Sequence, residues 1–151
     1  GDLLRQRETA QLALASQSGA LEHHIDPRFN EINNDEQVKC LLPKLVETTP
    51  HLSELVDRGL SSSKDYQKVI DAVFNYWVSP ECDEAGIRSW ADYSGAVKAA
   101  LQDVMAAQGS GKTVGIFTSG GTIATIVAQV LGLLSSASTR AIMEPSPERL
   151  L

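Results

Sequence analysis

The strongest information on fold lies in one stretch, TVGIFTSGGTIATIVAQVLGL, which runs from Thr113 to Leu133. Its first six residues are mostly apolar and rich in β-branched side chains, which predicts a buried β-strand at Thr113–Thr118. The small residues Ser119–Gly121 predict a tight turn, and helical spacing of apolar residues begins at about Thr122. A strand between two helices predicts α/β layering. One strand makes no sheet, so its partner strands would be weak in sequence, missing upstream, or on another chain.

The remainder of the chain favours helices, because apolar residues recur at the i, i+3, i+4 spacing of an amphipathic helix. The segments with helical character are Leu3–Ser18, Asn34–Val46, His51–Leu60, Tyr66–Trp77 and Trp90–Met105. Pro43 falls inside the second of these and is expected to kink or divide it. The tail, residues 135–151, contains two prolines and mixed polar residues, and we expect it to be poorly ordered.

Composition and charge exclude several classes of protein. Hydrophobic residues make up 42% of the 151-residue chain and charged residues 21%, as in an ordinary globular domain. The formal net charge of -6 disfavours a nucleic-acid partner, and no apolar run approaches the length of a membrane span. Two widely spaced cysteines, Cys40 and Cys82, favour a reducing compartment, so we predict a cytoplasmic protein. The sequence indicates no oligomeric state.

One tempting motif is a phosphate-binding loop at AAQGSGKT, Ala106–Thr113. Such a loop requires the order strand, glycine loop, helix, because the N–H groups of the helix N-terminus must converge on the phosphate. Here a helix precedes Gly109 and the predicted strand follows Lys112. We therefore expect a helix-stopping turn with Lys112 in solvent. The second glycine cluster, Ser119–Gly121, has the correct order and suits an anion, although a tight turn without a ligand is an equally good interpretation.

Four stretches, in this order along the chain, resemble the histidine phosphatase (phosphoglycerate mutase-like) superfamily. They are GDLLRQRETA at the start, DPRFNEIN at Asp26–Asn33, SWADYSGAVKAAL before the predicted strand, and GIFTSGGTIATIVAQVLGL. In the first stretch Leu3, Arg5, Thr9 and Ala10 match the family pattern, whereas Gln6 stands where alanine is usual. The last stretch is similar to a related bacterial subgroup with Thr-Ser-Gly-Gly at this turn, where most members carry His-Gly-Gly.

This resemblance implies a three-layer α/β/α domain over residues 1–134, incomplete at its N-terminus, with a variable helical insertion at about 34–86. It implies a phosphomonoester hydrolase or mutase-like phosphoryl transfer through a phosphohistidine, acting on a phosphorylated small molecule without a cofactor or metal. Arg5 would bind the phosphate, Ser119 and the Gly120 N–H would hydrogen-bond its oxygens, and Glu31 would donate a proton to the leaving oxygen.

Each of these roles has a plainer alternative. Arg5 would otherwise pair with Glu8 on the helix surface, and Glu31 would be a solvated loop carboxylate. The family's nucleophile lies in an Arg-His-Gly motif that this sequence does not contain. We therefore expect the nucleophile upstream of Gly1 and an inactive chain on its own. The alternative is a non-catalytic, phosphate-binding or regulatory member of the family.

The three histidines of the chain, His23, His24 and His51, match no catalytic position of the family. His23 and His24 are adjacent, so their side chains point to different sides of the chain, and no partner has the spacing of a metal ligand. The sequence therefore predicts no metal site.

Overall fold

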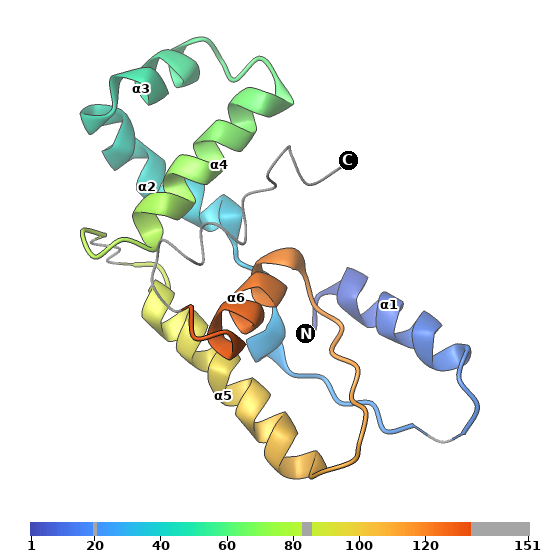
Figure 1. Cartoon of the computed structure of the whole chain (residues 1–151). Coiled ribbons are helices and arrows are strands. Elements are labelled where there is room, and N and C mark those ends of the chain that lie inside the picture. The colour runs from blue at the N-terminus through green and yellow to red at the C-terminus, as the bar shows by residue number, and fades with distance from the viewer. Residues whose placement is uncertain (20, 83–85, 134–151) are drawn as a thin grey trace, which may run out of the picture. The chain divides into compact units, whose positions relative to one another are not determined.

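The computed structural model describes residues 1–133 of the chain, apart from residue 20 and residues 83–85. All regular secondary structure in these described residues is helical (Figure 1). The elements are α1 (Leu4–Ala15), the short 3-10 helix η1 (Pro27–Phe29), α2 (Asn34–Thr48), α3 (Pro50–Asp57), α4 (Ser63–Trp77), α5 (Trp90–Gln108) and α6 (Gly120–Val130).

The predicted α/β class, with its three-layer α/β/α domain, is wrong for the residues that the structure describes. The segment predicted as a buried strand has no regular secondary structure and pairs with no strand in the described part of the chain, and Val114 within it is 46% exposed. A β-strand exists only where a neighbouring strand takes up its backbone hydrogen bonds, and β-branched residues do not supply that neighbour. The segment is instead tied down near its end, where the Gly1 nitrogen donates to the Phe117 carbonyl over 3.1 Å.

The chain divides into two compact units. The terminal unit combines Gly1–Ile32 with the part of the chain that begins at Tyr93, and the middle unit is Asn33–Asp92. The middle unit holds α2, α3 and α4. The boundaries predicted for the helical insertion, about 34–86, remain a prediction, and the predicted tail at residues 135–151 lies outside the described residues.

The middle unit is built on α2, which packs against α3 and α4. Its core side chains include Leu41, Leu52, Val69 and Val73, all of them almost fully buried. An aromatic cluster of Phe74, Trp77 and Trp90 adjoins them, with the two indole rings 5.4 Å apart in an edge-to-face arrangement. Two side chains fix the ends of helices: Asn33 accepts from the Glu36 amide and Ser62 from the Asp65 amide.

The helical spacing of the sequence predicted every α-helix of the structure to within a few residues at each end. Pro43 does not divide its helix, because α2 continues from Asn34 to Thr48. The predicted turn after α5 is confirmed: α5 ends at Gln108, both Gly109 and Gly111 have positive φ, and Lys112 is exposed. Only the strand expected after this turn is absent from the described residues.

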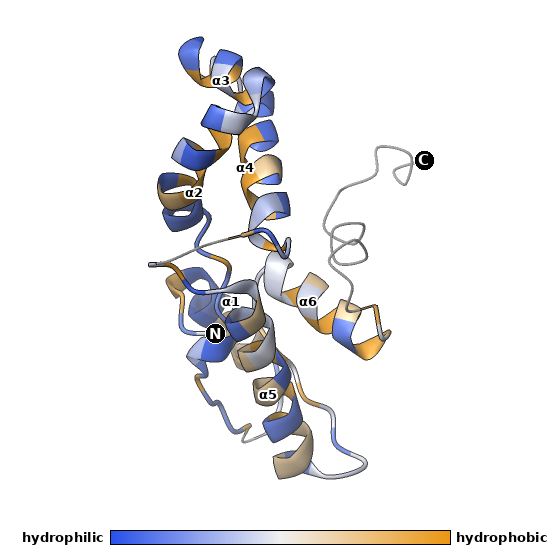
Figure 2. Cartoon of the chain, turned by 90° about the vertical axis from the view of Figure 1, so that its left-hand side faces the viewer, coloured by the Kyte–Doolittle hydropathy of each residue, from blue (hydrophilic) through white to orange (hydrophobic). Residues whose placement is uncertain are grey.

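The core of the terminal unit includes the start of α6. Thr122 in the first turn of α6 and Thr125 at the middle of this helix are almost completely buried, as are Val97 and Ala100 on α5. The remainder of α6 is strongly apolar, as Figure 2 shows by its colour. No helix among the described residues combines the length and the apolar character needed to cross a membrane.

Candidate functional site

The four residues that the sequence predicted as a site lie on three segments of the terminal unit. Arg5 is in the first turn of α1, and Glu31 follows η1. Ser119 is the residue before α6, and Gly120 is the first residue of α6. Hydrogen bonds join all three segments at the start of α6. The structure therefore brings the four residues together, although the sequence separates them widely.

Arg5 reaches Ser119 directly. Its Nη2 donates to the Ser119 Oγ over 3.2 Å, across 114 positions of sequence. The alternative of a surface ion pair with Glu8 is not what the described residues show, because their salt bridges do not include Arg5. The arginine side chain is exposed. Its permanently charged, planar guanidinium thus lies at the surface beside the N-terminal end of a helix.

Gln6 is the residue of this site that the sequence did not predict. It is 4% exposed, and its Nε2 donates to the Ser119 Oγ over 3.0 Å and to the Phe29 carbonyl over 3.4 Å. Its Oε1 accepts from the Leu3 amide over 3.3 Å. A polar residue next to two arginines on a polar helix gives no sign of burial. The one available signal was its departure from the alanine of the family pattern.

Glu31 places a carboxylate at the start of α6. Its Oε1 accepts from the Ile32 amide over 3.0 Å, and its Oε2 accepts from the Gly121 amide over 3.4 Å. Gly121 is necessary for this approach, because a β-carbon there would collide with the Glu31 carboxylate and the Ile32 side chain. Glu31 is therefore not a freely solvated loop residue. Its carboxyl group is half-buried and accepts hydrogen bonds from two backbone N–H groups.

A network of hydroxyl groups holds the Glu31 loop against α6. Thr122 Oγ1 donates to the Asn30 carbonyl over 2.9 Å, and the Tyr93 hydroxyl lies 2.9 Å from the same Thr122 oxygen. One residue before Ser119, the Thr118 hydroxyl donates to the Phe29 carbonyl. These bonds link α5, the loop and the start of α6, so the backbone beneath the candidate site is fixed by buried contacts.

The backbone at the start of α6 offers hydrogen-bond donors. The first N–H groups of any helix have no acceptor within it, and the aligned peptide dipoles make that end positive. Among the described residues, the Gly120 N–H donates to no protein group. Ser119 makes no side-chain cap to α6. The Gly120 N–H, the Arg5 guanidinium and the Ser119 hydroxyl together offer donors to an oxyanion, while the neighbouring Gly121 N–H already donates to Glu31.

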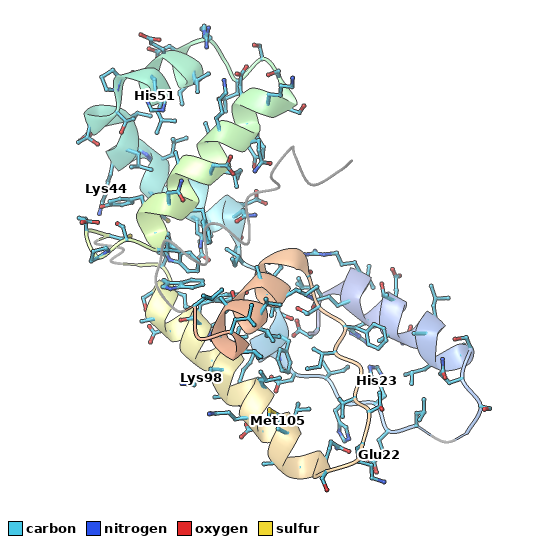
Figure 3. All side chains as sticks on the ribbon, viewed as in Figure 1. Glu22, His23, Lys44, His51, Lys98 and Met105 are labelled. Atoms are coloured by element: carbon cyan, nitrogen blue, oxygen red, sulfur yellow. The ribbon has the colours of Figure 1, made fainter. Side chains whose placement is uncertain are left out.

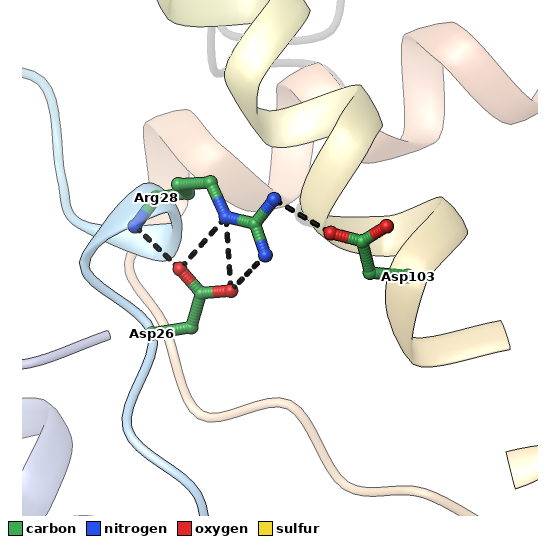
Figure 4. Close-up of polar contacts among 3 residues, drawn as sticks. All are labelled: Asp26, Arg28 and Asp103. Atoms are coloured by element: carbon green, nitrogen blue, oxygen red, sulfur yellow. Dashed lines mark hydrogen bonds and ion pairs between the residues drawn. The ribbon is translucent and has the colours of Figure 1, made fainter. Parts of the chain in front are cut away.

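A second arginine in this unit is already committed to carboxylates. Arg28 donates to both oxygens of Asp26 and, over 2.7 Å, to Asp103 of α5 (Figure 4). The hydrogen bond from Arg28 is the main cause that lowers the pKa of Asp26 below its usual range, and Asp26 and Asp103 raise the pKa of Arg28. This cluster ties η1 to α5. Its positive charge is matched by these carboxylates, so Arg28 is not available to a ligand in the way that Arg5 is.

The histidines take no part in these contacts. His23 belongs to the segment between α1 and η1, and His51 lies on α3 of the middle unit (Figure 3). His24 pairs with Glu22 at the surface. Within the described part of the chain, no hydrogen bond or ion pair joins a histidine to Arg5, Glu31 or Ser119, and no group of His, Cys, Asp and Glu side chains has the geometry of a metal site.

Comparison with known proteins adds nothing to this geometry, because no family model, no curated protein and no solved structure matches the chain.

Proposed function

We propose that the chain binds the phosphoryl group of a phosphorylated small molecule at the start of α6. We propose further that it acts in phosphomonoester hydrolysis or mutase-like phosphoryl transfer, as in the histidine phosphatase superfamily that its sequence resembles. One observation carries the proposal. The Arg5 guanidinium is hydrogen-bonded to the residue that precedes α6, across 114 positions of sequence. We assign this activity to the cytoplasm, on the cysteine content of the sequence.

The proposed site supplies what a phosphoryl group requires. Negative charge spreads over the equatorial oxygens in the transition state, so positive charge and N–H or O–H donors around these oxygens lower the barrier. Arg5 provides the charge and a forked set of donors. Ser119 provides a hydroxyl, and Gly120 provides a backbone N–H at the positive end of α6.

Glu31 is the proposed proton donor to the leaving oxygen. When the bond from phosphorus to that oxygen breaks, the oxygen gains negative charge and must take up a proton. Glu31 lies at the same helix end, with one carboxylate oxygen 3.4 Å from the Gly121 amide nitrogen. Its two backbone contacts, with the Ile32 and Gly121 amides, fix the carboxyl group at this helix end.

A non-catalytic role in phosphate binding is the second candidate. It is favoured by the histidines, since none in the described residues is hydrogen-bonded or ion-paired to Arg5, Glu31 or Ser119. Phosphoryl transfer through a phosphohistidine would need a histidine supplied from elsewhere. We therefore expect the chain alone to bind phosphate and to release no product from p-nitrophenyl phosphate. Measurable hydrolysis by the chain alone would contradict both the expected inactivity and the non-catalytic candidate.

The binding proposal is tested by titrating the chain with inorganic phosphate in an isothermal calorimeter. Arg5→Ala is expected to weaken binding by about tenfold or more, because a charge-assisted hydrogen bond contributes roughly 1.5 to 3 kcal/mol. Arg7→Ala is the matched control, since Arg7 is also exposed on α1 and its loss changes the net charge equally. Equal weakening by the two substitutions, or no binding of phosphate by the unaltered chain, would overturn the proposal.

A further inference from the structure

We propose that Gln6 is a positioning residue of the phosphate site, which fixes the Ser119 hydroxyl as a hydrogen-bond donor to the ligand. The inference rests on the proposed phosphate binding and adds a residue that neither the sequence nor the family resemblance assigns.

The neighbours of Gln6 determine which way its amide group faces. A backbone N–H can only donate and a backbone carbonyl can only accept. The Leu3 amide lies 3.3 Å from one end of the Gln6 side chain, so that end is the oxygen. The Phe29 carbonyl lies 3.4 Å from the other end, so that end is the NH₂ group. These two contacts agree, and they exclude the flipped amide.

The orientation of Gln6 then sets the role of Ser119. With the NH₂ group 3.0 Å from the Ser119 Oγ, Gln6 must donate to this oxygen. The Arg5 guanidinium, which has donors only, approaches the same oxygen at 3.2 Å. A hydroxyl oxygen has two lone pairs, and these two donors occupy both. The Ser119 proton must therefore point to a third position.

No protein acceptor among the described residues takes the Ser119 proton. Ser119 is only half-buried, and it adjoins the positive end of α6. The hydroxyl, the Arg5 guanidinium and the Gly120 N–H then present donors alone. A ligand in this position must offer acceptors, as the unprotonated oxygens of a phosphate do. A serine free to rotate would lose part of this preference, since its lone pairs would at times face the anion.

The burial of Gln6 holds its amide group, and with it the Ser119 hydroxyl, in one orientation. Its side chain is 4% exposed and has partners at both ends, so the amide cannot turn without leaving a buried polar group unsatisfied. Gly1 contributes by its small size, because a β-carbon there would collide with the Gln6 amide. The position of Ser119 is thus set by the interior of the unit, whereas Arg5 reaches it from the surface.

The test is a double-mutant cycle measured by calorimetric titration with inorganic phosphate. Gln6→Met keeps the approximate shape of the side chain and removes its donors. We expect it to weaken phosphate binding about three- to tenfold, the range of one ordinary hydrogen bond. In a Ser119→Ala background the same change should have no further effect, because there is no hydroxyl to position. Gln37→Met is the matched control, since Gln37 is equally buried but belongs to the middle unit.

The possible results distinguish a failure of the positioning role of Gln6 from a failure of the proposed phosphate binding. Failure of the unaltered chain to bind phosphate would reject the proposed function itself. Phosphate binding that Gln6→Met leaves unchanged, or weakens equally with and without the Ser119 hydroxyl, would overturn the positioning role alone.

A second variant guards against loss of folding, which circular dichroism detects. Gln6→Glu keeps the acceptor for the Leu3 amide but replaces the donor with an acceptor that attracts the Ser119 proton. Gln6→Glu should weaken phosphate binding more in the chain that keeps Ser119 than in the chain that carries Ser119→Ala. If both substitutions at Gln6 unfold the chain, its role is structural and the inference is overturned.

Discussion

The hydroxyl of Tyr93 lies 2.9 Å from the hydroxyl oxygen of Thr122 in the buried interior of the terminal unit. Tyr93 belongs to α5 and Thr122 to the first turn of α6, and both reach the Asn30 carbonyl. This one carbonyl therefore joins two helices to the loop that carries Glu31.

Tyr93→Phe should destabilise the terminal unit without disturbing its packing. The substitution removes hydrogen bonds but leaves the ring, and an ordinary hydrogen bond contributes about 0.5 to 1.5 kcal/mol. We expect a loss of this order in the free energy of unfolding, measured by urea titration. Tyr66→Phe provides the control, because Tyr66 is an exposed tyrosine of the middle unit. Equal effects of the two substitutions would contradict the assigned role of Tyr93.

Gly121→Ala and Gly120→Ala should differ although the two glycines are adjacent. A β-carbon at Gly121 collides with Glu31 and Ile32, whereas one at Gly120 meets nothing within 4 Å. Crowding of a packed interior costs roughly 1 to 3 kcal/mol, so we expect a loss of this size for Gly121→Ala. Gly120→Ala should be neutral or slightly stabilising, because alanine favours the helix. The melting temperatures of both variants are compared by thermal unfolding. Equal melting temperatures would refute the predicted difference between the two glycines.

The ion pair of Asp26 with Arg28 predicts a dependence of stability on pH. The hydrogen bond from Arg28 lowers the pKa of Asp26 in the folded chain, so folding favours the ionised carboxylate. This stabilisation is complete above the pKa of an unfolded aspartate, about 3.9, and is lost as the pH falls through the lower folded value. Asp26→Asn should therefore lower stability at neutral pH and reduce its decline below about pH 4.

The matched control for this prediction is Glu8→Gln, which also removes one carboxylate from the terminal unit. Glu8 is exposed on α1 and belongs to no salt bridge in the described part of the chain. Urea unfolding between pH 2 and pH 7 measures both variants. A decline with acid that is unchanged by Asp26→Asn would show that other carboxylates cause it.

Leu41→Ala should destabilise the middle unit severely. Leu41 is 1% exposed in the unit formed by α2, α3 and α4, and leucine to alanine changes in a core cost roughly 2 to 5 kcal/mol. Val56→Ala, at an exposed position of α3, should cost far less. Hydrogen exchange followed by NMR reports on each unit separately. We expect faster exchange in the middle unit of the Leu41 variant, and uniform protection in both variants would contradict this.

The sequence predicted the helices because their information is local. The spacing of apolar residues can be read from the sequence of one chain, and so can a capping residue such as Ser62. The strand was predicted wrongly at Thr113–Thr118. A β-strand forms only beside another strand that takes up its backbone hydrogen bonds, and the residues of the segment itself do not reveal whether such a partner exists. For the site, the family resemblance selected Arg5, Glu31 and Ser119, which the structure places together. It could not select Gln6. The burial of this polar side chain is decided by segments distant in sequence, such as η1, whose Phe29 carbonyl accepts a hydrogen bond from Gln6.

The bond between Arg5 and Ser119 also has a consequence for the order of events during folding. Closing a loop of 114 positions costs entropy that local contacts avoid, so this pair should form after the helices and after the middle unit. Interactions made late in folding affect the rate of unfolding and leave the rate of folding almost unchanged. Phosphate bound by this pair would therefore lengthen the lifetime of the folded chain while the chain folds no faster.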